Sequence, residues 1–173
     1  MAVLDYFSAV AKKRPWQAMA VTRGELVPGS EETIYRALAI RHLELPVKEM
    51  LLEGLQKDLP DSPGLIESIH SNILDEEKHD LALNYVAEAH GVNEQAEAEA
   101  MRIRQAWLDH PAHPIAKVAT LERSLFFTLL PFFRFNGDKG IRTVATDISR
   151  DEICHAFCHT KICEEANEKY GES

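Results

Sequence analysis

The sequence predicts an all-α protein in which four long helices form a bundle of two antiparallel hairpins joined by a crossover, with a short additional helix at the N-terminus. Three observations predict this fold. Apolar residues recur with the period of a helix in four long segments, and no segment shows the period of two that is typical of a strand. The sequence Asp-Glu-x-x-His also occurs twice, at 75–79 and at 151–155. The Glu and His of each copy are three residues apart and therefore share one face of a helix.

The size of the chain suits one domain. It has 173 residues, of which 45% are hydrophobic, enough for one well-buried core. We expect an N-terminal extension at 1–29, to which the sequence assigns no chemistry, and a single helical domain at 30–170.

Composition and charge restrict the partners and the compartment. A formal net charge of -9 argues against nucleic acid or an anionic membrane as a partner, and no apolar run approaches a membrane span. The basic residues at 12–14 follow the amphipathic start, which is the wrong order for a signal peptide. Cys154, Cys158 and Cys163 lie close together on one predicted helix, a spacing that indicates free thiols in a reducing compartment. We therefore expect a cytoplasmic protein.

The first hairpin is predicted from its caps and its turn. Ser30 is placed as an N-cap, with Glu31 and Glu32 in the first turn of a helix that extends to about Asp58. The turn at 59–64 contains two prolines and a glycine. The second helix begins at about Leu65 and ends near His90, where Gly91 suits the position after a helix C-terminus.

The second half of the chain repeats this design. The polar segment 93–109 is helical by propensity and is stopped by prolines, so it is predicted to be the crossover. A mostly apolar third helix at 115–135 and a fourth helix at 141–170 are separated by a glycine-containing turn. Pro46 and Pro131 should disturb the first and third helices, because proline removes a backbone hydrogen bond.

Glu122 is the most informative single residue. It is the only acidic residue between Pro114 and Gly137, and it lies in the apolar stripe of the third helix. An unpaired carboxylate is costly in such a position, so Glu122 is predicted to be a metal ligand. The alternative is an ion pair with Arg123 or Lys117.

On the first helix the matching ligand is predicted to be Glu44, with Glu49 and Glu53 as rivals. Glu44 lies in an apolar stripe, and its distance from the hairpin turn matches that of the other candidate glutamates, which places all of them at one level of the bundle. A third Glu-x-x-His, formed by Glu67 and His70, lies near the end of the bundle and on the wrong side of its helix. It is predicted to be a coincidence.

These residues together predict a dinuclear metal centre. The set of four carboxylates and two imidazoles suits iron or manganese better than zinc or copper. Two divalent cations would also offset part of the acidic charge. The predicted ligands are Glu44, Glu76, His79, Glu122, Glu152 and His155.

Further residues are predicted to surround the ligands. Asp75 and Asp151 are expected to accept the remaining ring N–H of the histidine in the facing motif, and His159 shares the face of Glu152. An alternative zinc site would use His155 and His159, which are four residues apart. The histidine pair and the cysteine pair at 154 and 158 point in different directions around the helix. One ion could therefore not easily be bound by both pairs.

At this point the chain resembles the ferritin-like diiron-carboxylate superfamily. The sequence Leu-Glu-Arg-Ser-Leu-Phe-Phe at 121–127 and the sequence Ile-Ser-Arg-Asp-Glu-x-x-His-x-Phe at 148–157 are similar to the third and fourth helices of ribonucleotide reductase small subunits and their oxidase relatives. Leu83 occupies the position of the radical tyrosine of that family. The resemblance implies a ferritin-like bundle that covers about residues 30–165.

The resemblance also implies a function. The implied function is that of a diiron oxidase or oxygenase, which holds two iron ions, or manganese or a mixed pair, and uses dioxygen, a small organic substrate and an external electron donor. A homodimer is one expected arrangement of the chain. A ferroxidase or a peroxide-scavenging protein of the ferritin or rubrerythrin kind is the first alternative. A non-catalytic helical interaction module, with 93–109 as its binding face, is the second.

Overall fold

The computed structural model describes residues 5–170, and within them it contains helices and no strand. None of the helices in this part of the chain combines the length and the apolar composition needed to cross a membrane. The elements in chain order are α1 (Tyr6–Ala11), α2 (Glu31–Ala39), the 3₁₀ segment η1 (Ile40–Leu43), α3 (Glu44–Gly54), α4 (Leu65–His90), α5 (Glu94–Asp109), α6 (Pro114–Ser124), the π-helical segment η2 (Leu125–Leu129), α7 (Leu130–Asn136) and α8 (Lys139–Tyr170).

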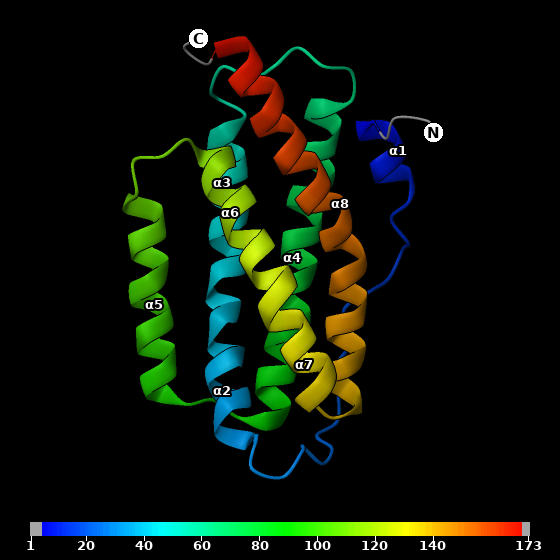
Figure 1. Cartoon of the computed structure of the whole chain (residues 1–173). Helices are drawn as coiled ribbons and strands as arrows, with labels where there is room; N and C mark the ends of the chain where they lie inside the picture. Colours follow the sequence, from blue (N-terminus) through cyan, green and yellow to red (C-terminus); the bar gives the residue numbers. More distant parts are fainter. Residues whose placement is uncertain (1–4, 171–173) are drawn as a thin grey trace.

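Four helical columns pack side by side along the molecule (Figure 1). The first is α2–η1–α3, the second is α4, the third is α6–η2–α7 and the fourth is α8. Helix α3 packs on α4 and α6, and α8 packs on α4, α6 and α7, so the contacts close a ring around one interior. Neighbours within each hairpin run in opposite directions (Figure 1). Every long helix is therefore able to direct one face toward the same interior.

Helix α5 crosses from one hairpin to the other along the outer edge (Figure 1). It packs on α2, η1 and α3 through a small contact of alanines. The buried guanidinium of Arg41 donates to both carboxylate oxygens of Glu97, at 2.6 and 2.8 Å, and fixes α5 against the first column. The predicted crossover is thus a helix packed on the other helices.

The predicted boundaries of the second helix are confirmed, since α4 ends at His90 and Gly91 has a φ of +92°. The prediction for Ser30 is right in position only. Ser30 precedes α2, but its hydroxyl donates to the carbonyl of Val27 at 2.6 Å and makes no bond to a helix N–H. The serine therefore stabilises the turn before the helix.

Both predicted proline disturbances are present. The 3₁₀ segment η1 comes directly before α3, which carries Pro46 in its first turn. The π-helical segment η2 comes directly before α7, which carries Pro131 in its first turn. In each column the irregular turn precedes the proline, because it is the preceding carbonyls that lose a donor. Glu44 is the first residue of α3 and lies at one of these breaks.

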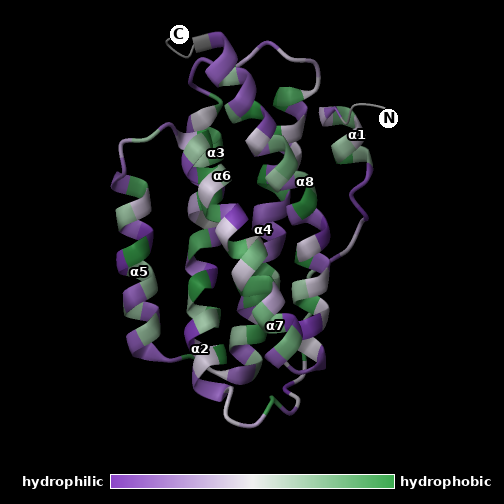
Figure 2. Ribbon diagram, in the orientation of Figure 1, coloured by the Kyte–Doolittle hydropathy of each residue, from purple (hydrophilic) through white to green (hydrophobic). Residues whose placement is uncertain are grey.

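The apolar core has two separate parts. One contains Val47, Ile69 and Ile162, toward one end of the columns, and the other contains Val86 and Val144, toward the opposite end. On α4 and the third column, the predicted ligands fall in sequence between the residues of the two parts. On α8, Glu152 falls between them, and His155 follows Cys154 of the first part. Figure 2 shows hydrophilic and hydrophobic residues interspersed along these columns. The polar level is thus closed off by an apolar layer on either side.

Candidate metal centre

The six predicted ligands converge in the interior of the columns. They form two overlapping groups that share Glu76, and within each group the ligand atoms lie within 4.8 Å of one another. All six side chains are buried, with Glu76, His79 and His155 at 0% exposure. The first group contains Glu76, Glu122, Glu152 and His155, and the second contains Glu44, Glu76 and His79.

The rival residues lie elsewhere. Glu49 and Glu53 are exposed on α3, where Glu53 pairs with Lys57 at 3.2 Å. Glu67 and His70, which form the third Glu-x-x-His, are exposed on α4. The interior position of Glu44, and the exclusion of these four residues, agree with the prediction from helical depth.

The two imidazoles face the carboxylates through the same ring nitrogen. His155 Nδ1 lies 3.1 Å from Glu76 Oε1, 3.3 Å from Glu122 Oε1 and 3.5 Å from Glu152 Oε1. His79 Nδ1 lies 3.3 Å from Glu152 Oε1 and 3.8 Å from Glu44 Oε2. The ring centroids of the two histidines are 5.6 Å apart. One helix turn between Glu and His on α4 and on α8 produces this convergence.

The other nitrogen of each imidazole binds the aspartate of the facing motif. His79 Nε2 lies 3.1 Å from Asp151 Oδ2, and His155 Nε2 lies 3.1 Å from Asp75 Oδ2. The ring N–H at Nε2 donates to the carboxylate, which leaves Nδ1 of each ring free to act as an acceptor or a ligand. The predicted exchange of aspartates between α4 and α8 is therefore present.

His159 adds a third histidine to the interior. The amide nitrogen of Asn72 lies 3.1 Å from His159 Nε2, so the amide donates to it and the ring carries its proton on Nδ1. His159 Nδ1 then donates to Glu122 Oε2 in a short contact. The alternative ion pairs for Glu122 are absent among the residues described, since Lys117 Nζ donates to the carbonyl of Leu108 and Arg123 is exposed.

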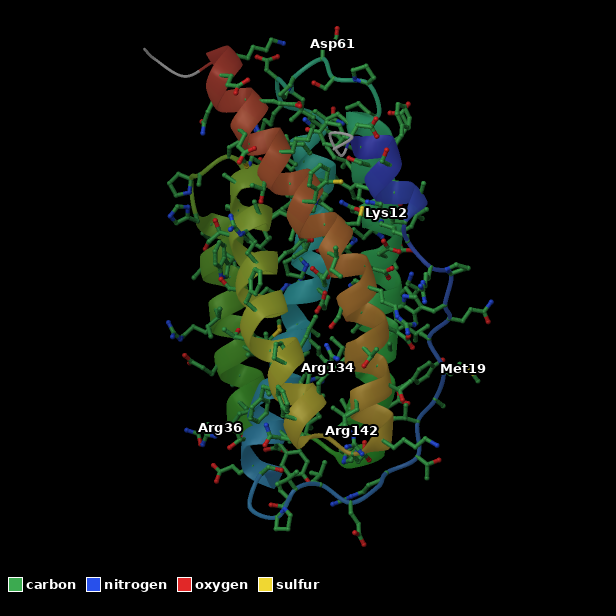
Figure 3. All side chains as sticks on the ribbon, turned by 45° about the vertical axis from the view of Figure 1, so that its right-hand side comes forward. Lys12, Met19, Arg36, Asp61, Arg134 and Arg142 are labelled. Carbon is green, nitrogen blue, oxygen red and sulfur yellow. The ribbon has the colours of Figure 1, made fainter. Side chains whose placement is uncertain are left out.

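The N-terminal segment covers the aspartates, a role that the sequence did not indicate. Trp16 Nε1 donates to Asp151 Oδ2 at 2.7 Å, and its ring stacks on His79 at a centroid distance of 6.0 Å. Lys13 Nζ makes a short ion pair with Asp75. Figure 3 shows the segment running along the outside of the columns between Lys12 and Met19. Residues 12–30 form no helix, so no periodic pattern could reveal these contacts.

Lys78 links the two aspartates. Its ammonium lies 2.8 Å from Asp75 Oδ1 and 2.9 Å from Asp151 Oδ2. It also lies 4.6 Å from the centre of the Trp16 ring. Lys78 occupies one of the two unspecified positions of the first Asp-Glu-x-x-His. The motif therefore gives no indication of its role.

Several buried atoms of this centre have no hydrogen-bond partner. They lie close to one another, but their directions do not satisfy hydrogen-bond geometry, and unsatisfied polar atoms are costly in an interior. A metal ion accepts such lone pairs, so the donor set fits one. The atoms are Glu76 Oε1 and Oε2, His79 Nδ1, Glu122 Oε1, Glu152 Oε2 and His155 Nδ1.

The protonation state of each residue in the centre depends on the charges of its neighbours. Burial raises the pKa of Glu76 well above its ordinary value, although His155 opposes the shift. Burial disfavours the charged form of His155 as well, but the carboxylates of Glu152 and Glu122 outweigh it and raise the pKa of this histidine. In the absence of metal the centre therefore holds protons near neutral pH. Bound cations would take the place of these protons.

The cysteines take no part in the centre. Cys154 and Cys158 are buried in the apolar core with their sulfur atoms 3.7 Å apart, and all three cysteines are free thiols. No group of candidate ligands within residues 5–170 includes a cysteine. The alternative zinc site at His155 and His159 gains no support, because these histidines face Glu122 from separate turns.

Comparison of the chain with protein-family models, with curated proteins and with solved structures finds no match. A proposal for the function therefore has to be based on the geometry of the centre.

Proposed function

We propose that this chain is a small oxidase or oxygenase with a ferritin-like four-helix bundle and a dinuclear iron or manganese centre, acting on a small organic substrate with dioxygen and an external electron donor. The observation that carries the proposal is the convergence of buried, unpartnered ligand atoms from four helical columns, with Glu76 common to both groups. A glutamate from each of two columns and a Glu-x-x-His from each of the other two is a pattern suited to a dinuclear site.

The donor set supports iron or manganese. Four carboxylates and two imidazoles are harder ligands than thiolates, and the buried cysteines lie outside the candidate groups. A metal pair in this place would supply the redox chemistry with dioxygen. The glutamates Glu44, Glu76, Glu122 and Glu152 and the histidines His79 and His155 would hold it.

The protein contributes orientation and a dry environment. Asp151 and Asp75 fix the rotation and tautomer of His79 and His155, so that Nδ1 points inward. The two apolar parts of the core close the polar level from both ends and keep water away. His159 can hold or deliver a proton at Glu122 Oε2, since its Nδ1 donates there.

Stopped-flow spectroscopy with oxygen consumption tests the proposal. Protein loaded anaerobically with Fe(II) is mixed with dioxygen, and we expect rapid oxygen uptake in proportion to the centre together with new visible absorption. The Glu152→Ala variant, loaded under the same conditions, should lose this reaction, whereas Glu164→Ala, an exposed residue of the same helix, should keep it. Equal oxygen uptake by both variants would contradict the proposal.

The same experiment separates the oxidase from a ferroxidase. An excess of Fe(II) should not be consumed beyond the amount that fills the centre, and sedimentation should show no large shell. Continued oxidation of excess Fe(II) by a shell-sized assembly would favour a ferritin-like iron-handling protein.

A further inference from the structure

A cationic pocket lies between the N-terminal segment and α8, outside the candidate metal centre. Its volume is about 540 Å³. Four basic side chains line it, and none of its lining residues is acidic. This is unusual for a chain with a net charge of -9. The basic residues are Lys12, Lys13, Arg14 and Arg150.

Two of these cations are free to bind a ligand. Lys13 is occupied by Asp75, and Arg150 pairs with Asp147 at 2.7 Å. Lys12 and Arg14 are exposed, and their side chains make no ion pair or hydrogen bond within residues 5–170. Other cations of this acidic protein do have carboxylate partners, for example Lys48 with Glu77. The positive charges of Lys12 and Arg14 are therefore not neutralised by a carboxylate of the described chain.

The rest of the pocket is apolar. Ile153 is 63% exposed, although it is a large hydrophobic residue. Cys154 follows it directly, and Phe157 lies one turn further along α8. The described part of the chain neither buries this isoleucine nor pairs the two neighbouring cations. The combination matches a ligand that has an anionic group at one end and an apolar body at the other.

We propose that this pocket binds a small organic anion, namely a carboxylate or a phosphate monoester that carries an apolar group. Arg14 and Lys12 hold the anionic group through charge-assisted hydrogen bonds, and Ile153 and Phe157 cover the apolar group. The pocket borders the metal centre through Lys13, which binds Asp75, and through Ile153 and Cys154, which lie between Glu152 and His155 on α8. The site does not depend on the metal centre and goes beyond the proposed oxidase function.

Calorimetry with phenyl phosphate tests the site on the full chain, with and without Mn(II). We expect saturable binding of one ligand with a Kd of about 0.1–1 mM, as for a ligand of this size. Benzoate should also bind, whereas benzyl alcohol, which lacks the charge, and inorganic phosphate, which lacks the ring, should bind at least about tenfold more weakly.

Variants locate the binding. The double variant Lys12→Gln with Arg14→Gln should weaken phenyl phosphate by about tenfold or more. Ile153→Glu, which places a like charge in the pocket, should do the same. The matched control removes two exposed cations elsewhere, Arg134→Gln with Arg142→Gln, and should leave the affinity unchanged; Figure 3 shows both residues toward the end of the molecule opposite Lys12.

Three results would overturn the proposal. They are the absence of saturable binding, equal affinity for benzyl alcohol or inorganic phosphate, and equal loss in the control and the pocket variants. All substituted side chains are exposed, and thermal unfolding of each variant verifies that it is folded.

Discussion

At the scale of single residues, Asp75 and Asp151 determine the ring orientation and the tautomer of His155 and His79. Each Asp accepts the Nε2 proton of a histidine on the facing helix, so each Nδ1 lone pair is directed to the glutamates. A histidine without this partner could rotate or change tautomer. Asp75 and Asp151 are therefore as much a part of the centre as the residues that would touch a metal.

Replacing Asp151 by Asn should weaken metal binding. The amide keeps the shape but removes the charge that holds His79, and we expect Mn(II) affinity to fall about 10–100-fold. Competition with a chelator measures it. Asp147→Asn is the control: it lies one turn earlier on α8 and, among the described residues, pairs with the exposed Arg150, so it should change the affinity less than about twofold. Equal effects of the two substitutions would refute the role of Asp151.

The pKa shifts predict an alkaline loss of stability in metal-free protein. The pKa of His79 and of His155 is raised above the ordinary 6.5, because neighbouring carboxylates outweigh burial. A raised pKa contributes stability that is full below pH 6.5 and is lost as pH rises through the raised value. The Tm of metal-free protein should therefore fall as pH increases above about 6.5.

At low pH the sign is the opposite. Burial opposes the charged form of Glu152, but His155 and His79 outweigh it and lower its pKa to about 2. Its contribution is present above the ordinary value of 4.5 and is lost as pH falls toward 2.

Mn(II)-loaded protein should lack the alkaline fall, because metal replaces the protons on the imidazoles. A Tm that is flat above pH 6.5 without metal would contradict these shifts.

At the scale of elements, the N-terminal segment is a strap over the two central helices. Lys13 Nζ binds Asn72 Oδ1 at 2.8 Å and Ser71 Oγ at 2.9 Å in addition to Asp75, and Trp16 reaches Asp151. The strap thereby holds α4 and α8 at the level of the candidate centre. The segment has no regular structure of its own, so its order depends on these polar contacts.

Lys13→Met should destabilise the protein. The substitution keeps the apolar stem but leaves Asp75 with fewer donors, which should reduce the free energy of unfolding by about 1–3 kcal/mol. Lys12→Met is the matched control at an exposed neighbour without a side-chain partner, and its effect should stay within about 0.5 kcal/mol. Urea unfolding of metal-free protein measures both. A loss no larger for Lys13→Met than for the control would show that the strap does not support the centre.

The elements also show what could be predicted from the sequence. Helical periodicity, the glycine at 91 and the spacing of Glu and His predicted the helices, because these features follow the helix repeat. The convergence of Glu44 with α4 was predicted from the helix repeat together with its distance from the hairpin turn. The contacts of Lys13 and Trp16 depend on the path of an irregular segment, which has no repeat. The hydrogen bond from the hydroxyl of Ser30 to the carbonyl of Val27, instead of a bond to a helix N–H, likewise depends on the path of this irregular segment.

At the scale of the whole molecule, one polar level lies between two apolar parts of the core. The four carboxylates at this level would repel one another if they were all ionised and no cation were bound. A pair of divalent cations would remove this repulsion. The closed ring of columns makes this level inaccessible to bulk water. The stability of the molecule should therefore increase directly with metal binding.

The number of metal ions bound per chain shows whether the polar level is a dinuclear centre. Elemental analysis of protein supplied with Fe(II) or Mn(II) should give about two ions per chain for the native sequence. Glu76→Ala should lose both, since Glu76 belongs to both groups, whereas the exposed Glu67→Ala should keep both. Failure of the native chain to bind either metal, or equal metal content in Glu76→Ala and Glu67→Ala, would contradict the account.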